Sequence, residues 1–223
     1  MGHVTVAPEG RKLLRLEVRN SETPIERVTA TGLRTTARDY ELDIIVYSTG
    51  FDAITGSFDA IDITGVDGVK LAEQWRDGPS TFLGMMAHGF PNLLMPTGPQ
   101  SGSASTNFPR GIENGVGWCM DLLEHIWRLG YTRAEPTAEA QARWTAHVTK
   151  MYAIMLMRKA KSWFTGYNSN VPGHEYGKPR YLVYNGGTPK YVAAITDVAQ
   201  KGYEGIVFDA DARASARSAT AAE

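Results

Sequence analysis

Apolar and polar residues alternate along the first fifty positions in the pattern typical of β structure. Leu13–Arg19 places every second, apolar side chain on one face. Ile25–Thr29 and Leu33–Thr36 are short runs rich in β-branched or apolar residues, separated by a plausible turn at Thr31-Gly32. This part of the chain therefore predicts short, consecutive strands.

Two continuous apolar runs follow a different pattern. Ile44–Ser48 and Asn92–Pro96 read as strands covered on both faces, as in a parallel sheet, and each ends in a glycine corner. The corners are Thr49–Phe51 and Thr97–Pro99. Ligands of open α/β sheets bind beyond the carboxyl ends of strands, so a nucleotide could lie at these corners. A bare structural turn is the alternative at each.

Three- and four-residue spacing predicts helices in the second half. They span about Gly111–Leu129, from Thr137 as N-cap to about Lys159, and from about Pro189 to Lys201. The first should bury one apolar face, formed by Ile112, Val116, Cys119, Met120, Leu123, Ile126 and Trp127. Residues 209–223 lack apolar periodicity and predict a disordered tail behind a folded part spanning 1–208.

Composition and charge narrow the classes of protein. The 223 residues are 43% apolar and 21% charged with a net charge of −1, so the chain is globular and offers no general reason to bind nucleic acid. One cysteine, Cys119, excludes an internal disulfide and a Cys-rich zinc site. No leader or apolar run of about 20 residues is visible, which predicts a cytoplasmic protein without a membrane span.

Catalytic signatures are sparse. The five histidines lack metal-ligand spacing, so no metal site is expected. Ser101, Ser103 and Ser105 lack the G-x-S-x-G elbow, and neither G-x-G-x-x-G nor G-x-x-x-x-G-K-[ST] occurs. A chain that handles a dinucleotide without these fingerprints does not itself contain the phosphate-binding βαβ unit.

The segment Ser162–Gly173 combines aromatic, amide and glycine residues. Tryptophan can stack or donate an indole hydrogen bond, and asparagine can donate and accept. Such a loop suits a lid over a planar or ribose-bearing ligand, with a packed surface loop as the alternative.

The ordered series of these features resembles the C-terminal part of the flavin-dependent Baeyer–Villiger monooxygenases. The match extends over roughly residues 13–208 and is carried by Tyr40–Ala53, Phe90–Met95, Thr97–Pro99, Thr106-Asn107, Ile112-Glu113, Ser162-Trp163, Val171–Gly173, Gly186-Gly187 and Lys201–Gly205. The resemblance implies an α/β fold: an incomplete FAD-binding Rossmann-type domain with a β-rich N-terminal part, parallel-sheet strands and a mostly helical C-terminal part.

The same resemblance implies FAD and NADPH as cofactors and a small-molecule ketone as substrate, with oxygen inserted next to the carbonyl. The resemblance places Thr49, Gly50 and Phe51 at the FAD site, and Gly98, Pro99 and Asn107 near the flavin ring. It places Gln100 and Ser101 on the substrate-side loop. Trp163 would belong to the loop that closes over the nicotinamide cofactor. Ser48 replaces the family's usual alanine, and either Asn168 or Asn170 could face the cofactor.

The family's dinucleotide fingerprints and catalytic arginine lie upstream of the matching region, and this sequence contains none of them. We therefore expect the chain alone to bind FAD weakly and not to catalyse oxygenation; no residue here is assigned a catalytic role. Three interpretations stay open: a truncated or split enzyme completed by a separate N-terminal half, a non-catalytic interaction module, and part of a flavin monooxygenase that oxidises nitrogen or sulfur.

Overall fold

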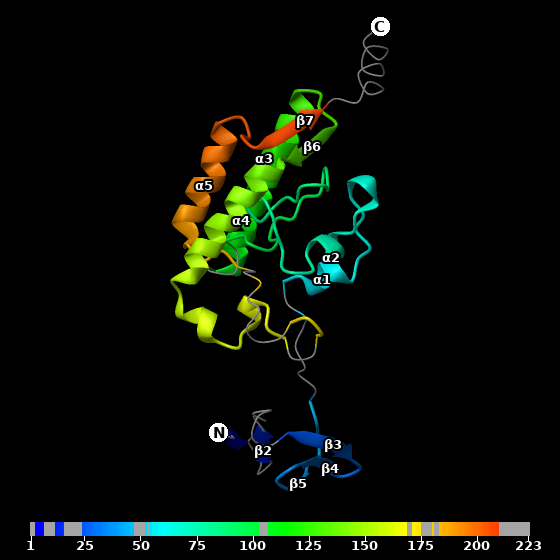
Figure 1. The fold of residues 1–223 in the computed structure, drawn as a ribbon. Coiled ribbons are helices and arrows are strands. Elements are labelled where there is room, and N and C mark those ends of the chain that lie inside the picture. The colour runs from blue at the N-terminus through cyan, green and yellow to red at the C-terminus, as the bar shows by residue number, and fades with distance from the viewer. Residues whose placement is uncertain are drawn as a thin grey trace. The chain divides into compact units, whose positions relative to one another are not determined.

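The computed structural model describes residues 3–6, 12–15, 24–46, 52, 54–102, 107–168, 171–174, 180 and 183–209. The chain divides into two compact units, Met1–Gly50 and Phe51–Glu223 (Figure 1).

The N-terminal unit consists of short antiparallel strands. β1 (His3–Val6) pairs with β2 (Lys12–Arg15), and β3 (Ile25–Thr29), β4 (Gly32–Thr35) and β5 (Asp39–Glu41) form a three-stranded meander. The alternation of the sequence thus predicted β structure here correctly, and β3 has the predicted bounds.

The predicted strand over residues 44–48 is wrong in its described part. The backbone leaves the meander after β5, and residues 42–46 are irregular. Ile44 and Val46 are 78% and 81% exposed. A parallel strand needs a neighbouring strand to accept its hydrogen bonds, and no described segment pairs with these residues. Every strand pairing in the described residues is antiparallel, so the parallel strands expected from the sequence are not found among them.

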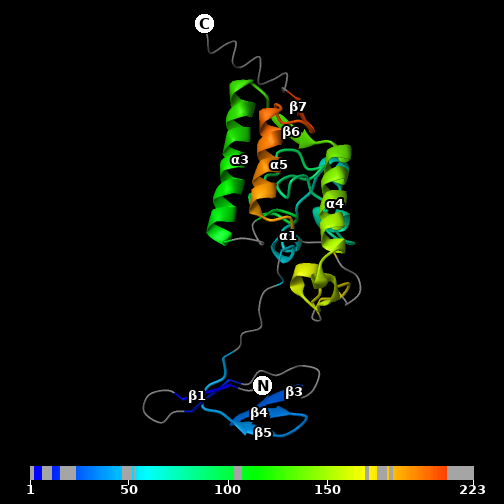
Figure 2. The same cartoon turned by 90° about the vertical axis from the view of Figure 1, so that its left-hand side faces the viewer.

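The second unit is built around three helices. α3 (Phe108–Arg128), α4 (Ala138–Ala153) and α5 (Thr188–Gln200) lie alongside each other, and β6 (Arg133–Pro136) pairs with β7 (Ile206–Asp209) at one end of them (Figure 2). The three helices enclose a core with aromatic and methionine side chains from the loop before α3. Its main members are Phe82, Met85, Met86, Trp118, Leu122, Trp144, Val148, Tyr184, Tyr191 and Ile195.

The helix α3 exists as predicted, but it buries a different face. Its buried residues are Gly111, Gly115, Trp118, Cys119 and Leu122. Most of the predicted apolar face is exposed instead, and only Cys119 and the partly buried Ile126 reach the core. Gly115 explains part of the difference, because a Cβ atom there would lie 1.9 Å from Pro96 O, so glycine lets the α3 backbone approach the preceding segment on this side.

The ends of the other two helices follow their capping residues. The Thr137 hydroxyl accepts a hydrogen bond from Ala140 N at 3.1 Å and starts α4 as predicted. α4 ends at Ala153, earlier than the predicted Lys159, and a separate 3-10 turn, η3, covers Leu156–Lys159. α5 has proline in its first turn and is followed by Gly202 at φ 69°, in agreement with the sequence.

Residues 92–96, the second predicted parallel strand, form an irregular segment. Asn92 has φ 62° and anchors the segment to β6, accepting from Ala134 N and donating its own N–H to Ala134 O, both at 2.9 Å. Because only this one residue pairs with β6, no ladder develops. Met95 joins a smaller core with Leu71, Trp75, Ala87 and Phe90 beneath the short helices α1 (Gly56–Asp59) and α2 (Leu71–Gln74).

Candidate functional site

The loop Thr97–Gly102 lies between this irregular segment and α3, and its backbone is packed closely. A Cβ atom at Gly98 would lie 2.6 Å from Gly84 O, and one at Gly84 would lie 2.3 Å from Ser101 N. Gly84 also has φ 73°, which favours glycine. The glycines therefore bring two backbone segments into direct contact, and they fix the corner that the sequence marks as a cofactor position. Gly98 and Pro99 are buried at this corner.

Gln100 occupies the centre of the loop with its side chain directed into the protein. The amide oxygen accepts from Thr81 N at 3.2 Å, from the Thr81 hydroxyl at 2.9 Å and from the Thr145 hydroxyl at 3.2 Å. Its side-chain amide nitrogen donates to Pro79 O at 2.8 Å, and its backbone carbonyl oxygen accepts from the Trp144 indole N–H at 3.3 Å. The residue is fully buried and has φ 66°. Its side chain thus holds the loop to Thr81 and to Thr145 on α4.

Ser101 and Gly102 continue the loop toward α5. Ser101 is 4% exposed, and its carbonyl accepts from Tyr184 N at 3.3 Å. A Cβ atom at Gly102 would lie 2.5 Å from the ring of Tyr191, whose hydroxyl donates to Leu83 O at 2.8 Å. Burial raises the pKa of Tyr191, so this phenol stays protonated and serves as a donor.

Asn107 is the N-cap of α3, and its side-chain oxygen accepts from Arg110 N at 3.4 Å. Residues 103–106 between Gly102 and this cap lie outside the described residues. The first turn of α3 holds no acidic residue, and Arg110 lies in it. Since the N-terminal N–H groups of a helix favour negative charge, this end of α3 suits an anionic or electron-rich group.

Trp163 is positioned by the 3-10 turn η4 (Trp163–Thr165). Ser162 organises this turn: its hydroxyl accepts from Phe164 N at 3.2 Å and its carbonyl accepts from the Thr165 hydroxyl at 2.7 Å. Trp163 is 44% exposed and stacks on Phe164 at 3.8 Å between ring centroids. A stacked, half-exposed indole on a rigid turn is available to a planar ligand.

A hydrogen bond connects the residues after this turn to Asp52. The Asn168 amide donates to an Asp52 carboxylate oxygen at 3.2 Å. Thr49, Gly50, Phe51 and Asn170 lie outside the described residues. Of the two candidate asparagines, Asn168 is the one that the structure describes, and a described partner of its side chain is Asp52.

Arg180 was not singled out by the sequence, although the structure gives it a central place near η4. It is 5% exposed; its N–H donates to Thr165 O at 2.9 Å and its guanidinium donates to Trp75 O at 2.7 Å and contacts the His174 ring. A Cβ atom at Gly166 would lie 2.8 Å from the Arg180 side chain. No periodic pattern in the sequence marks a buried arginine at this position.

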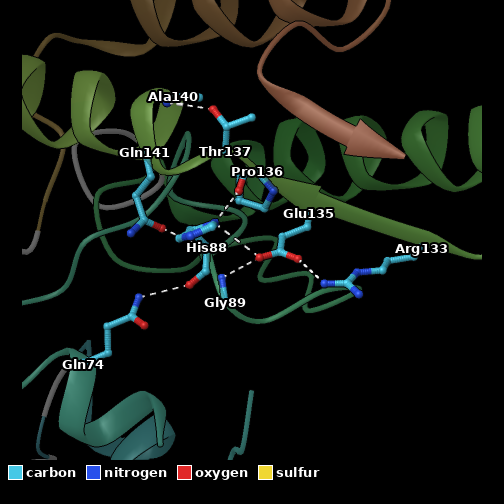
Figure 3. Close-up of polar contacts among 9 residues, drawn as sticks. All are labelled: Gln74, His88, Gly89, Arg133, Glu135, Pro136, Thr137, Ala140 and Gln141. Carbon is cyan, nitrogen blue, oxygen red and sulfur yellow. Dashed lines mark hydrogen bonds and ion pairs between the residues drawn. The ribbon is translucent and has the colours of Figure 1, made fainter. Parts of the chain in front are cut away.

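A second polar cluster surrounds Glu135 on β6 (Figure 3). One carboxylate oxygen accepts from Gly89 N at 2.8 Å and lies 3.2 Å from His88 Nδ1, and the other accepts from Arg133 at 2.6 Å. Burial by itself raises the pKa of Glu135, but the hydrogen bonds from Arg133 and Gly89 and the nearby positive charges outweigh it and lower this pKa. The carboxylate thus ties the loop at residues 88–89 to β6.

Two further side chains hold the same loop. Gln141 on α4 accepts from His88 N at 2.7 Å, and Gln74 on α2 donates to His88 O at 3.2 Å. His88 Nδ1 also lies 3.0 Å from Pro136 O, and Figure 3 shows the residue between these partners. The arrangement joins α2, β6 and α4, so we interpret it as a structural junction.

We expect the Glu135 junction to make stability depend on pH. Because the folded-state pKa of Glu135 lies below its ordinary 4.5, its contribution is present above that value and is lost as the pH falls through the folded-state pKa. Glu135→Gln should cost about 1–2 kcal/mol at pH 7 and flatten the decline of stability at acidic pH. The melting temperatures of the wild type and the variant, measured between pH 3 and 7, test both expectations. The exposed Glu124→Gln variant is the control, and an equal change in both would contradict the assignment.

Metal and membrane features are not found in the part of the chain that the structure describes. Within it, no three His, Cys, Asp or Glu residues come together as a metal site. None of its helices has the length and apolar character needed to cross a bilayer.

Comparison with known proteins gives no matching family model but clear relatives. The chain is 39% identical over 186 residues to 2-oxo-Δ3-4,5,5-trimethylcyclopentenylacetyl-CoA monooxygenase of Pseudomonas putida, covering 82% of this chain and 33% of the relative. It is 37% identical over 193 residues to phenazine N-monooxygenase PhzNO1 of Lysobacter antibioticus, covering 85% and 34%. A Baeyer–Villiger monooxygenase of Pseudooceanicola batsensis is 35% identical over 187 residues, covering 83% and 33%.

A solved structure agrees with these relatives. The crystal structure of OTEMO complexed with FAD and NADP superposes with a TM-score of 0.74 at 36% identity, covering 85% of this chain and 34% of that one. The chain thus spans about a third of the length of the proteins it matches, and the resemblance read from its sequence is confirmed.

Proposed function

Because this chain is homologous to a segment of the Baeyer–Villiger monooxygenases over 82–85% of its own length, we propose that it supplies the cofactor-enclosing part of such an enzyme. In this proposal residues 1–208 form the C-terminal part of the FAD-binding monooxygenase domain, and the complete enzyme inserts oxygen next to a ketone carbonyl. The observation that carries it is the sequence match together with a similar backbone at a TM-score of 0.74.

The described residues fit a flavin beside the loop Thr97–Gly102. The α3 N-terminus at Asn107 holds no acidic side chain in its first turn, so the positive end of the helix dipole suits the electron-rich edge of a flavin ring. In this proposal Gly98 and Pro99 shape the wall beside the flavin, and Thr49, Gly50 and Phe51 are assigned to FAD by the family resemblance alone. FAD, when bound, supplies the redox chemistry and NADPH the reducing equivalents.

The structure also supports distinct roles for the other proposed residues. We propose that Trp163 stacks over the nicotinamide side and that the hydrogen bond from Asn168 to Asp52 helps to hold the segment that follows its turn. Gln100 acts as a positioning residue for the loop, because protein groups already occupy its amide. Ser101 follows it on the proposed substrate side. These residues bind, orient and exclude water, and none of them is assigned a proton-transfer step.

We expect the isolated chain to bind FAD weakly and to be inactive, because the dinucleotide fingerprints are absent from its sequence. Titration with FAD, followed by flavin fluorescence, should show no saturation at low micromolar concentrations. Co-expression with the segment of the Pseudomonas putida relative that this chain does not match should restore retained FAD and ketone-dependent NADPH oxidation. Stoichiometric FAD binding by the isolated chain would contradict the first expectation, and a co-purified complex without flavin would contradict the second.

Oxidation of nitrogen is the second candidate function. It is favoured by the 37% identity to a protein named phenazine N-monooxygenase, which is within two percentage points of the identities to the other two relatives. The same reconstituted complex separates the two reactions. Product analysis with a cyclic ketone and with a phenazine as alternative substrates shows which one is oxygenated.

A further inference from the structure

The helix α3 carries a second apolar face, which we call the α3 stripe. It consists of Ile112, Val116, Met120, Leu123 and Trp127, which are 42–84% exposed. At 100° per residue these five positions fall within about 80° of the helix circumference. They therefore form one continuous row along the helix.

The α3 stripe is separate from the face that builds the core. Trp118 and Leu122 face inward, and the Trp118 indole donates to Ile195 O on α5 at 2.9 Å. In Figure 2 α3 lies at the margin of the helical layer, with α5 on one side. Apolar residues thus surround more than half of α3, whereas the described residues cover only the inward part.

An exposed row of this kind indicates an interaction surface. Isolated apolar residues are common on protein surfaces, but contiguous apolar patches mark binding sites or aggregation-prone faces. Trp127 is 84% exposed, and tryptophan is among the residues that contribute most to protein interfaces. A standard interface buries about 800 Å² per partner, so the α3 stripe would form the apolar centre of a larger contact.

The lengths of the matched proteins supply a candidate partner for the α3 stripe. The matched proteins are about three times as long as the region they share with this chain, and their backbone agrees with it at a TM-score of 0.74. The α3 stripe also starts at Ile112, five residues after Asn107, the N-cap that the proposed function places near the flavin. We propose that the α3 stripe docks the remaining part of the monooxygenase fold, the part that carries the dinucleotide fingerprints, whether the same or another polypeptide supplies it.

This inference rests on the proposed function, and its test is scored by protein association, independently of flavin or activity. The probe is the tagged segment of the Pseudomonas putida relative that this chain does not match, co-expressed with the 223-residue chain. Val116→Lys with Leu123→Lys alters the stripe. Asp121→Lys with Glu124→Lys introduces the same residue twice on the polar side of the same helix and is the matched control.

We expect the wild-type chain and the control to co-purify with the probe, and the stripe variant to do so at least tenfold less.

Failure of the wild type to co-purify would overturn the proposal, as would equal loss in both variants. A wild-type dimer in sedimentation that the stripe variant abolishes would show self-association instead. A melting temperature of the isolated stripe variant more than about 5 °C below the control would show that the stripe is buried within the chain. A complex that forms without FAD supports the docking and contradicts the proposed function.

Discussion

The substitution Gly115→Ala is expected to lower the free energy of unfolding by about 3 kcal/mol. A Cβ atom at Gly115 would lie 1.9 Å from Pro96 O, far inside the contact distance, and a backbone carbonyl cannot rotate away as a side chain can. The helix α3 would have to move away from the segment leading into Thr97–Gly102. The proposed flavin corner would therefore be displaced together with the helix.

Gly117→Ala is the control for this prediction. Gly117 lies on the same helix, half a turn away, and an added Cβ atom would have nothing within 4 Å. Alanine is about 1 kcal/mol better than glycine in a helix interior, so this variant should be slightly more stable than the wild type. Thermal denaturation followed by circular dichroism compares the two variants. Similar melting temperatures for both would show that α3 does not press against Pro96.

The second large effect is expected for Gln100→Leu, at about 3 kcal/mol of destabilisation. Leucine has a similar size but leaves Thr81 N–H and Pro79 O buried without the amide that bonds them. It also removes an acceptor of the Thr145 hydroxyl on α4. The loop then loses its attachment to both neighbouring segments.

The exposed Gln74→Leu variant is the control for Gln100, because Gln74 makes one hydrogen bond, to His88 O, at the surface. We expect it to change stability by less than about 0.5 kcal/mol. Urea unfolding of both variants measures the difference. If Gln100→Leu were as mild as Gln74→Leu, water would be able to replace the amide, and the loop would be open to solvent.

Local signals predicted the helices well because they act over a few residues. Thr137 caps α4 through its own hydroxyl, and the proline in the first turn of α5 and Gly202 after it delimit that helix. The face of α3 could not be predicted in the same way. Its sequence shows a wide apolar arc, and which half is buried depends on where glycine allows another backbone to approach.

The strands were harder to predict because pairing is not local. Residues 44–46 have the composition of a buried strand, yet no described segment pairs with them. β6 (Arg133–Pro136), by contrast, contains two charged residues and a proline, which do not favour a strand. It forms a strand because β7 lies next to it and pairs with it. Apolar composition describes what a strand would bury, whereas strand formation requires a neighbour.

The sequence proposed residues for the candidate site but not the contacts that surround them. The sequence marked the glycine corners and Trp163, but not that Gln100 faces the interior or that Arg180 and Glu135 hold the surrounding segments. Those contacts join residues far apart in the chain, such as Gln100 to Thr145 and Arg180 to Trp75. A single sequence contains no local pattern that reports them.

The buried position of Cys119 makes its thiol a built-in probe of the separation of α3 from the core. It is the only cysteine, it is 5% exposed, and burial raises its pKa to about 11. A thiol reagent can therefore modify the protein only when α3 separates from the core. The modification rate, measured across denaturant concentrations, gives the free energy of that opening event without an engineered label. The same measurement made on a complex would show by how much a bound polypeptide suppresses the opening.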